Sequence, residues 1–228
     1  MELKLDTICA LASGGGIGAI AVIRISGTYS RKILSQCFSK DLSQAQSHTI
    51  HFGTISGNDG TQIDEVLVSY FEHGRSFTGE ESIEISCHGS PYVQQQILAV
   101  LQQCGCRMAE PGEFTKRAFI NGKLDLSQAE AVADLIASQS KKAHRIALSQ
   151  LKGNLSSDLK VLRESLIAFA SLIELELDFS EEDVEFADRT QLKELVAKVL
   201  TTVEQLSASF ALGNALKNGV PVAIVGAP

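Results

Sequence analysis

The sequence predicts a mixed-sheet α/β domain at residues 1–118, an α-helical region at 119–217, and the first strand of a further domain at 218–228. In the first part, short stretches rich in Ile and Val alternate with Gly and Pro, which is typical of strands separated by turns. In the second part, Gly and Pro become rare and apolar residues recur every three or four positions. That spacing is typical of helices that bury one face.

Five stretches of the first domain read as strands, because they are rich in β-branched residues and bounded by turn residues. The third and fourth are joined by Gly-Asn-Asp-Gly at 57–60, which predicts a hairpin. Residues 28–38 predict a short helix. Ser90-Pro91 predicts the start of a second helix, since Ser caps helices and Pro is tolerated in their first turn. The expected strands are 6–13, 19–26, 48–56, 63–71 and 81–87.

Three helices are expected in the second region. Ser127 and Glu130 have the spacing of a capping box, so the first helix would begin there and end near Gly153. Apolar stripes at 155–177 and 192–210 predict the second and third helices. Such stripes must be buried, either by other helices of this chain or in part by missing segments or a second subunit.

The last residues predict the beginning of another domain. Residues 220–225 read as a fully buried strand of a parallel sheet. The Gly-Ala-Pro that follows at 226–228 fits the opening of a P-loop, G-x-x-x-x-G-K-[ST], whose remainder is missing. Because a single core strand has no sheet to join, we expect the chain to be cut inside this loop.

Composition restricts the class of protein. The net charge is −7 and the pI about 5.3, so any contact with nucleic acid is expected to be local. The five cysteines are odd in number, and the pair 104 and 106 lacks the C-x-x-C spacing of a zinc or redox site. They predict reduced thiols. There is neither a long apolar run nor a signal-peptide pattern, so a cytoplasmic protein with no membrane partner is expected.

Three charged residues are candidates for binding a ligand. Arg24 lies in an apolar strand, where it would form either a structural ion pair or a clamp for an anion or a ring edge. Glu84 alternates with isoleucines, and its carboxylate could bind the N–H edge of a pterin-like or guanine-like ring. Lys123 lies at the junction of the two regions, where small-molecule sites often form, although it could equally be a surface lysine.

Two further motifs allow both a binding and a structural interpretation. The glycine-rich loop 13–18 is followed by a strand and lacks the third glycine of a dinucleotide-binding motif, so it is a turn or a loop that closes over a ligand. His88-Gly89 precedes an expected helix N-terminus, where an anion would be favoured. A single histidine in that position is also compatible with a structural role.

Long blocks of the sequence resemble the MnmE (TrmE) tRNA modification GTPases, and the resemblance extends along the whole chain. Ser90 stands where a second glycine is common in this family. The blocks are SFTGEESIEISCHGS at 76–90, PGEFTKRAFINGKLDLSQAEAVADLI at 111–136, LDFSEEDVEF at 177–186 and VAIVGAP at 222–228.

The resemblance implies a first domain similar in fold to the tetrahydrofolate-binding domains of aminomethyltransferase-type proteins. Such a domain would form a homodimer and bind 5-formyl- or 5,10-methylene-tetrahydrofolate as the one-carbon donor. The implied ligand contacts fall on Arg24, Glu84 and Lys123 of this sequence. Glu84 is expected to hold the pterin edge, while Arg24 and Lys123 would serve polar or anionic parts of the folate.

The resemblance also implies the activity of a longer protein. With MnmG (GidA), a partner that uses FAD and NADH, it would add an aminomethyl or carboxymethylaminomethyl group to C5 of the tRNA wobble uridine. GTP, Mg²⁺ and K⁺ would belong to a GTPase domain inserted in the helical domain. Neither a catalytic residue nor a metal ligand is expected within these 228 residues, which should not hydrolyse GTP.

Two other functions are considered. The first is a stand-alone folate-dependent aminomethyl- or formyltransferase, for which Glu80, Glu81 and Asp125 are candidate catalytic carboxylates. Turnover with folate and a small amine would favour it. The second is a dimerisation scaffold with a vestigial pocket, which a stable dimer without folate binding would favour.

Overall fold

The computed structural model describes residues 6–178, 189–218 and Gly226. The chain divides into two compact units, Met1–Leu124 and Asp125–Pro228. The strand expected at 220–225 lies outside the described residues, as does most of the block 177–186. Among the described helices, none is both long enough and apolar enough to cross a membrane.

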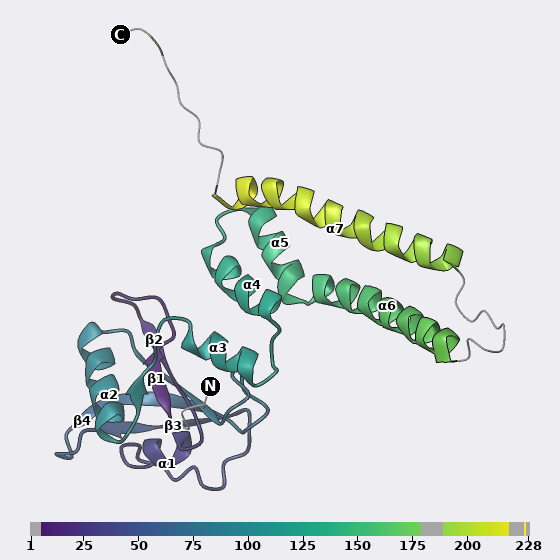
Figure 1. The fold of residues 1–228 in the computed structure, drawn as a ribbon. Helices are drawn as coiled ribbons and strands as arrows, with labels where there is room; N and C mark the ends of the chain where they lie inside the picture. Colours follow the sequence, from purple (N-terminus) through teal and green to yellow (C-terminus); the bar gives the residue numbers. More distant parts are fainter. Residues whose placement is uncertain (1–5, 179–188, 219–225, 227–228) are drawn as a thin grey trace. The chain divides into compact units, whose positions relative to one another are not determined.

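The described part of the first unit forms a mixed six-stranded sheet, which confirms the predicted α/β class (Figure 1). The strand order is β3-β4-β5-β2-β1-β6, and every neighbouring pair is antiparallel except β1 with β6. The predicted hairpin connects β3 to β4. The strands are β1 (Ile8–Leu11), β2 (Ile20–Ser26), β3 (Thr49–Ser56), β4 (Gln62–Phe71), β5 (Ser82–His88) and β6 (Arg107–Met108).

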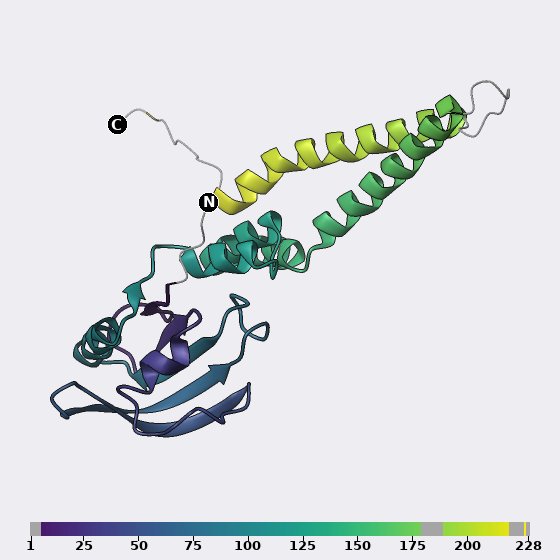
Figure 2. The same cartoon turned by 60° about the horizontal axis from the view of Figure 1, so that its bottom comes forward.

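Alternation of side chains along the strands gives the sheet one buried face. Ile23 and Ile25 of β2 and Ile83 and Ile85 of β5 are completely buried and belong to the same apolar cluster as residues of two helices. Each such side chain contributes about 1.5–3 kcal/mol by leaving water. The two helices are α1 (Ser30–Leu34) and α2 (Pro91–Gln103), on the same side of the sheet (Figure 2).

The opposite face, called the open face below, carries the alternate side chains, among them Arg24 and Glu84. Beside them, Ile20, Phe52 and Leu67 are exposed to 70%, 53% and 46%. The cross-strand register places Phe52 opposite Leu67 and Leu67 opposite Ser86, which lies two residues beyond Glu84. Contiguous exposed apolar side chains of this kind are typical of a surface that another molecule covers.

Two elements at the end of the first unit have no counterpart in the sequence-based expectations. The short strand β6 extends the sheet beside β1. Helix α3 spans Glu113–Ile120 and begins after Gly112, whose φ of 76° lies in the left-handed region that glycine adopts at little cost. α3 ends at Ile120, and Lys123 follows three residues later.

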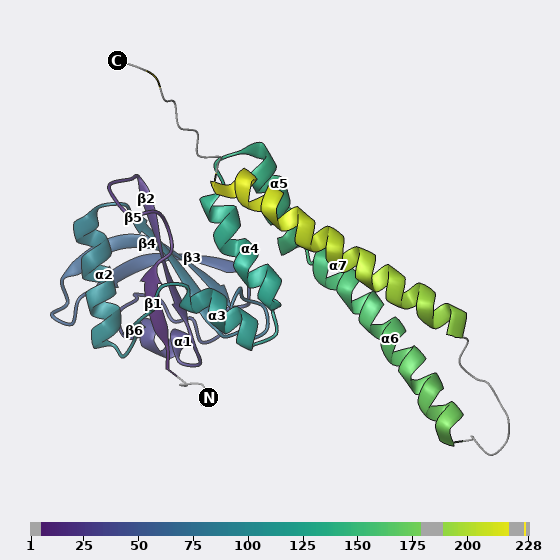
Figure 3. The same ribbon diagram turned by 45° about the horizontal axis from the view of Figure 1, so that its top comes forward.

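The described part of the second unit contains four helices (Figure 3). The single helix predicted from 127 to 153 is wrong, because the chain breaks at 138–140. Ser138 is extended there, and the side chain of Ser140 accepts a hydrogen bond from the amide of Ala143, which starts a new helix. Helices α6 and α7 lie side by side. The helices are α4 (Leu126–Ala137), α5 (Lys141–Leu151), α6 (Asn154–Asp178) and α7 (Arg189–Asn218).

The helix caps also differ from the expectation. Asp125, not Ser127, caps α4: its side chain accepts from the amide of Gln128, whose side chain in turn accepts from the amide of Asp125. This is a capping box two residues earlier than the one predicted from Ser127 and Glu130. Ser90 does occupy the N-cap position of α2, but its side chain makes no capping hydrogen bond.

Candidate functional site

Arg24 and Glu84 form the centre of the candidate site. They are register partners on β2 and β5, so their side chains leave the open face at the same level. Arg24 Nε and Nη2 donate to Glu84 Oε1 at 3.0 and 2.7 Å. The two side chains retain 24% and 30% exposure, which leaves the pair accessible from solvent.

Two aromatic rings hold the guanidinium in place. The Cζ atom of Arg24 lies 5.2 Å from the ring centroid of Phe77 and 5.5 Å from that of Phe114. These are cation–π distances, and contacts of this kind restrict the orientation of a planar cation. Phe77 belongs to the loop before β5 and Phe114 to α3, so both segments contribute directly to the site.

Lys123 lies beside the same loop as Phe77. Its Nζ donates to the carbonyl of Gly74 at 3.0 Å. A Cβ atom added to Gly79 would lie 3.1 Å from Lys123 Cγ, which shows how closely the lysine stem follows the loop. Asn121 donates to the carbonyl of Thr78 at 2.7 Å and fixes the loop from the same side. The structure thus brings Arg24 and Glu84 into contact and connects Lys123 to them through residues 74–79.

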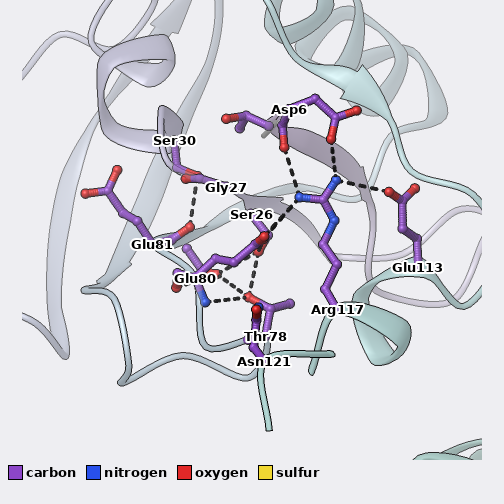
Figure 4. A network of polar contacts seen from close by, with 12 residues as sticks. Asp6, Ser26, Gly27, Ser30, Thr78, Glu80, Glu81, Glu113, Arg117 and Asn121 are labelled. Atoms are coloured by element: carbon purple, nitrogen blue, oxygen red, sulfur yellow. Dashed lines mark hydrogen bonds and ion pairs between the residues drawn. The ribbon is translucent and has the colours of Figure 1, made fainter. Parts of the chain in front are cut away.

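An ionic network fixes the base of this loop (Figure 4). The guanidinium of Arg117, whose side chain is only 8% exposed, contacts Asp6 at 2.7 Å and Glu80 and Glu113 at 3.1 Å each. Arg107 also pairs with Asp6 and Glu113, both at 2.6 Å. Five charged groups therefore share one cluster, in which each charge has an opposite partner.

The network perturbs the acids that belong to it. Hydrogen bonds from Arg107 lower the pKa of Glu113 from its usual 4.5 to about 2. Burial raises the pKa of Asp6, but hydrogen bonds from Arg107 and Arg117 outweigh burial and hold it below its usual value. Both groups are therefore carboxylates at neutral pH.

Sequence reasoning missed Arg117 and Thr78 as parts of the site. Both lie within the blocks that carry the family resemblance, but an Arg four residues after a Glu in a helical pattern is the ordinary signature of an exposed pair. Only the tertiary fold shows that Arg117 points inward, toward residues that lie far away in the sequence.

The other candidate carboxylates and His88 all have structural partners. Glu80 accepts from Arg117 and Ser26. Glu81 accepts from Arg31 and Tyr70, and Asp125 caps α4. His88 Nδ1 lies 2.7 Å from the Asp64 carboxylate. The partner of His88 in the structure is therefore this carboxylate, whereas the sequence suggested a bound anion near this position.

The glycine-rich loop contains a close backbone contact, and none of the cysteines forms a disulfide. The backbone of Gly18 approaches Gly89 so closely that a Cβ at Gly89 would lie 2.3 Å from the Gly18 carbonyl oxygen. The five cysteines are free thiols, and burial raises the pKa of Cys37 to about 12. Within the described residues, no three His, Cys, Asp or Glu side chains are arranged to hold a metal ion.

The chemistry available at the site is recognition of a polar, planar ligand. Glu84 receives both Arg24 bonds on Oε1, so Oε2 can accept from an N–H edge. The planar guanidinium and the Lys123 ammonium provide donors for carbonyl or carboxylate oxygens. The exposed ring of Phe77 adds an aromatic surface at the same place.

The chain matches two families of known proteins. One family model, described as the GTP-binding protein TrmE N-terminus, matches residues 7–123, and another, the MnmE helical domain, matches 126–221. Together with the fold, these matches define a TrmE-type α/β domain followed by an MnmE-type helical domain.

Curated relatives agree with this division. They are called tRNA modification GTPase MnmE. The protein of Flavobacterium johnsoniae is 58% identical over 99% of this chain and 49% of its own length. The protein of Bacteroides fragilis is 55% identical over 98% of this chain and 49% of its own length. The protein of Christiangramia forsetii is 56% identical over 98% of this chain and 48% of its own length. The chain belongs to the MnmE (TrmE) family of tRNA modification GTPases. It spans about half the length of the curated relatives it matches.

Proposed function

We propose that the first unit binds a reduced folate, 5-formyl- or 5,10-methylene-tetrahydrofolate, as the one-carbon donor for tRNA modification. The observation that carries the proposal is the Arg24–Glu84 pair on the open face, with Lys123 joined to it through residues 74–79. A pterin ring offers adjacent N–H groups that suit the free oxygen of Glu84, and the folate glutamate offers carboxylates that suit a cation.

For the whole protein, we propose the activity that the family membership supports. With an FAD-dependent partner, MnmG, it adds an aminomethyl or carboxymethylaminomethyl group to C5 of the wobble uridine of tRNA. GTP hydrolysis with Mg²⁺ and K⁺ accompanies this reaction and belongs to the whole protein. The share of this chain is to hold the folate that supplies the carbon. Its overall negative charge is compatible with a cytoplasmic protein whose contact with tRNA is local.

The folate site is tested by calorimetric titration with 5-formyltetrahydrofolate. Glu84→Gln keeps the shape of the side chain and removes its charge, so we expect affinity to fall at least about tenfold, the loss typical of a hydrogen bond to a charged group. Lys123→Met is expected to weaken binding as well. The matched control is Glu164→Gln, which removes a carboxylate from the exposed pair of Glu164 with Lys160 on α6. Equal affinity in Glu84→Gln and wild type would reject the assignment.

We further propose that the open face is where two copies of the first unit meet. Ile20, Phe52 and Leu67 are exposed on this face, which also carries Arg24 and Glu84. A homodimer would therefore cover apolar surface and enclose the folate.

The dimer is tested by sedimentation velocity. Phe52→Lys and Leu67→Lys together are expected to convert the dimer to monomer, because two buried ammonium groups per copy would face apolar surface. Tyr92→Lys, at an exposed position of α2 on the other side of the sheet, is the control and should leave the dimer intact. A dimer that persists with both open-face substitutions would exclude this face as the interface.

A further inference from the structure

Three buried hydroxyls lie immediately beside the Arg24–Glu84 pair. Ser26 and Ser82 are register partners on β2 and β5, two residues along each strand from Arg24 and Glu84. Side chains two residues apart lie on the same face, about 7 Å apart along the strand. The two serines therefore form the next level of the same face, and both are almost completely buried.

Thr78 connects the two serines. Its Oγ1 lies 2.6 Å from Ser26 Oγ and 3.2 Å from Ser82 Oγ, and the serine hydroxyls are 3.2 Å apart. Because a carboxylate only accepts, Ser26 donates to Glu80 Oε2 at 2.7 Å and so accepts from Thr78. These three hydroxyls, the hydroxyl triangle, thus have a fixed direction of hydrogen bonding that ends on Glu80.

The triangle is anchored to α3. Glu80 also accepts from Arg117, while Asn121, at the end of α3, donates to the backbone carbonyl of Thr78. Lys123 follows Asn121 by two residues. Each of the three proposed folate contacts is therefore two residues away from a member of this one network: Arg24 from Ser26, Glu84 from Ser82, and Lys123 from Asn121.

We propose that Thr78 is a positioning residue. Its hydroxyl ties β2 to β5 directly, and through Ser26 and Glu80 to Arg117 of α3. It thereby sets the relative placement of Arg24, Glu84 and Lys123. The proposal rests on the folate site described above. The separation of β2 and β5 is set chiefly by backbone bonds, but the direction of long side chains such as Arg24 also depends on what is packed at the next level. The hydroxyl triangle occupies that level, and apolar side chains of the same size could not form its hydrogen bonds.

The test compares Thr78→Val, which keeps the shape and removes the hydroxyl, with Thr78→Ser, which keeps the hydroxyl. In the 228-residue chain, we expect Thr78→Val to weaken binding of 5-formyltetrahydrofolate about tenfold and Thr78→Ser to retain it. The matched control is Thr54→Val on β3, because the Thr54 hydroxyl is not part of the triangle. Binding is measured at a temperature where thermal unfolding shows every variant folded.

A second readout does not need folate. The Nε–H resonance of Arg24 in a ¹⁵N-correlation NMR spectrum reports its hydrogen bond to Glu84, and we expect it to shift or broaden in Thr78→Val but not in Thr54→Val. This separates the two proposals: wild-type protein that fails to bind folate would reject the folate site, and the Arg24 resonance would still decide the role of Thr78.

Three outcomes would overturn the positioning role. The first is wild-type affinity together with an unchanged Arg24 resonance in folded Thr78→Val. The second is a larger loss in Thr78→Ser than in Thr78→Val. Ser keeps the hydroxyl and lacks the γ-methyl group, so this result would point to packing of the methyl group instead of the hydroxyl. If Thr78→Val does not fold, Ser82→Ala replaces it in the test. The third outcome is then an unchanged Arg24 resonance in Ser82→Ala.

Discussion

At the scale of single residues, Arg117 has more ionic partners than any other described residue of the first unit. Removing one partner from such a buried cluster is costly, because it leaves a charge without its counterpart in a poorly solvated place. Glu113 is the partner whose removal can be followed with pH. Its pKa of about 2 means that the folded state binds its proton more weakly than the unfolded chain does, where 4.5 is usual.

We therefore expect Glu113→Gln to lose stability in a pH-dependent manner. A carboxylate with a depressed pKa contributes stability that is fully present above pH 4.5 and is lost as pH falls toward 2. The difference in unfolding free energy should be about 1–2 kcal/mol at pH 7, since solvent at the partly exposed Arg107 screens the pair. It should shrink steadily below pH 4.5. Urea unfolding between pH 7 and 3 measures this, and a difference that does not change with pH would contradict it.

At the scale of elements, the start of α4 shows how a local pattern can misplace a cap. Asp125 and Ser127 are both good N-cap residues, and the sequence offers Gln128 three residues after one and Glu130 three residues after the other. The structure uses Asp125, whose pKa is lowered by hydrogen bonds from Ser156 and from the amide of Gln128. A carboxylate at this position also interacts favourably with the helix dipole.

The two caps make opposite predictions for alanine substitution. Asp125→Ala should lower the free energy of unfolding by about 1 kcal/mol, the usual loss for an N-cap. Ser127→Ala, inside the first turn, should change it by less than about 0.5 kcal/mol. Thermal unfolding of both variants, compared with wild type, measures the effect. A larger loss in Ser127→Ala than in Asp125→Ala would restore the original capping box.

Sequence patterns predicted the sheet well, because strict alternation along the strand of Ile83 and Ile85 fixes which side chains are buried. They also selected Arg24 and Glu84, since charged residues amid β-branched ones need a partner. They did not predict α3 or β6. β6 is only two residues long, and α3 is eight residues that carry charges inward, contrary to the ordinary pattern of an amphipathic helix. Its inward charges, Glu113 and Arg117, are explained only by tertiary contacts.

At the scale of the whole molecule, the two units differ in how much apolar side chain they bury. The first has one continuous cluster that includes the isoleucines of β2 and β5. Among the described residues of the second, the buried apolar ones are Ala131, Ala147, Leu162 and Phe169. Val161 and Leu200, by contrast, are both 57% exposed. Free energy of local opening follows such burial.

We expect amide hydrogen exchange to be faster in α6 and α7 than in β2 and β5. Helices whose apolar residues remain in contact with water open at a lower free energy than buried strands do. Exchange measured by mass spectrometry at neutral pH resolves the two units. Equal protection in both would mean that the second unit is stabilised by more than the contacts described here, for example by association of two copies.

The pairing of β1 with β6 has a consequence for synthesis on the ribosome. β1 is translated before every other strand of the described sheet, yet its neighbour on one side is β6, and one of the two ionic partners of Asp6 is Arg117, 111 positions later. One edge of β1 therefore stays unpaired until nearly the whole unit has been translated, and an unpaired strand edge favours association with other chains. The last element of the first unit, α3, contributes Glu113 and Arg117 to the charge cluster and Phe114 to the candidate site. A nascent chain thus completes the pairing of β1 and the contacts around Arg24 late in the synthesis of this unit.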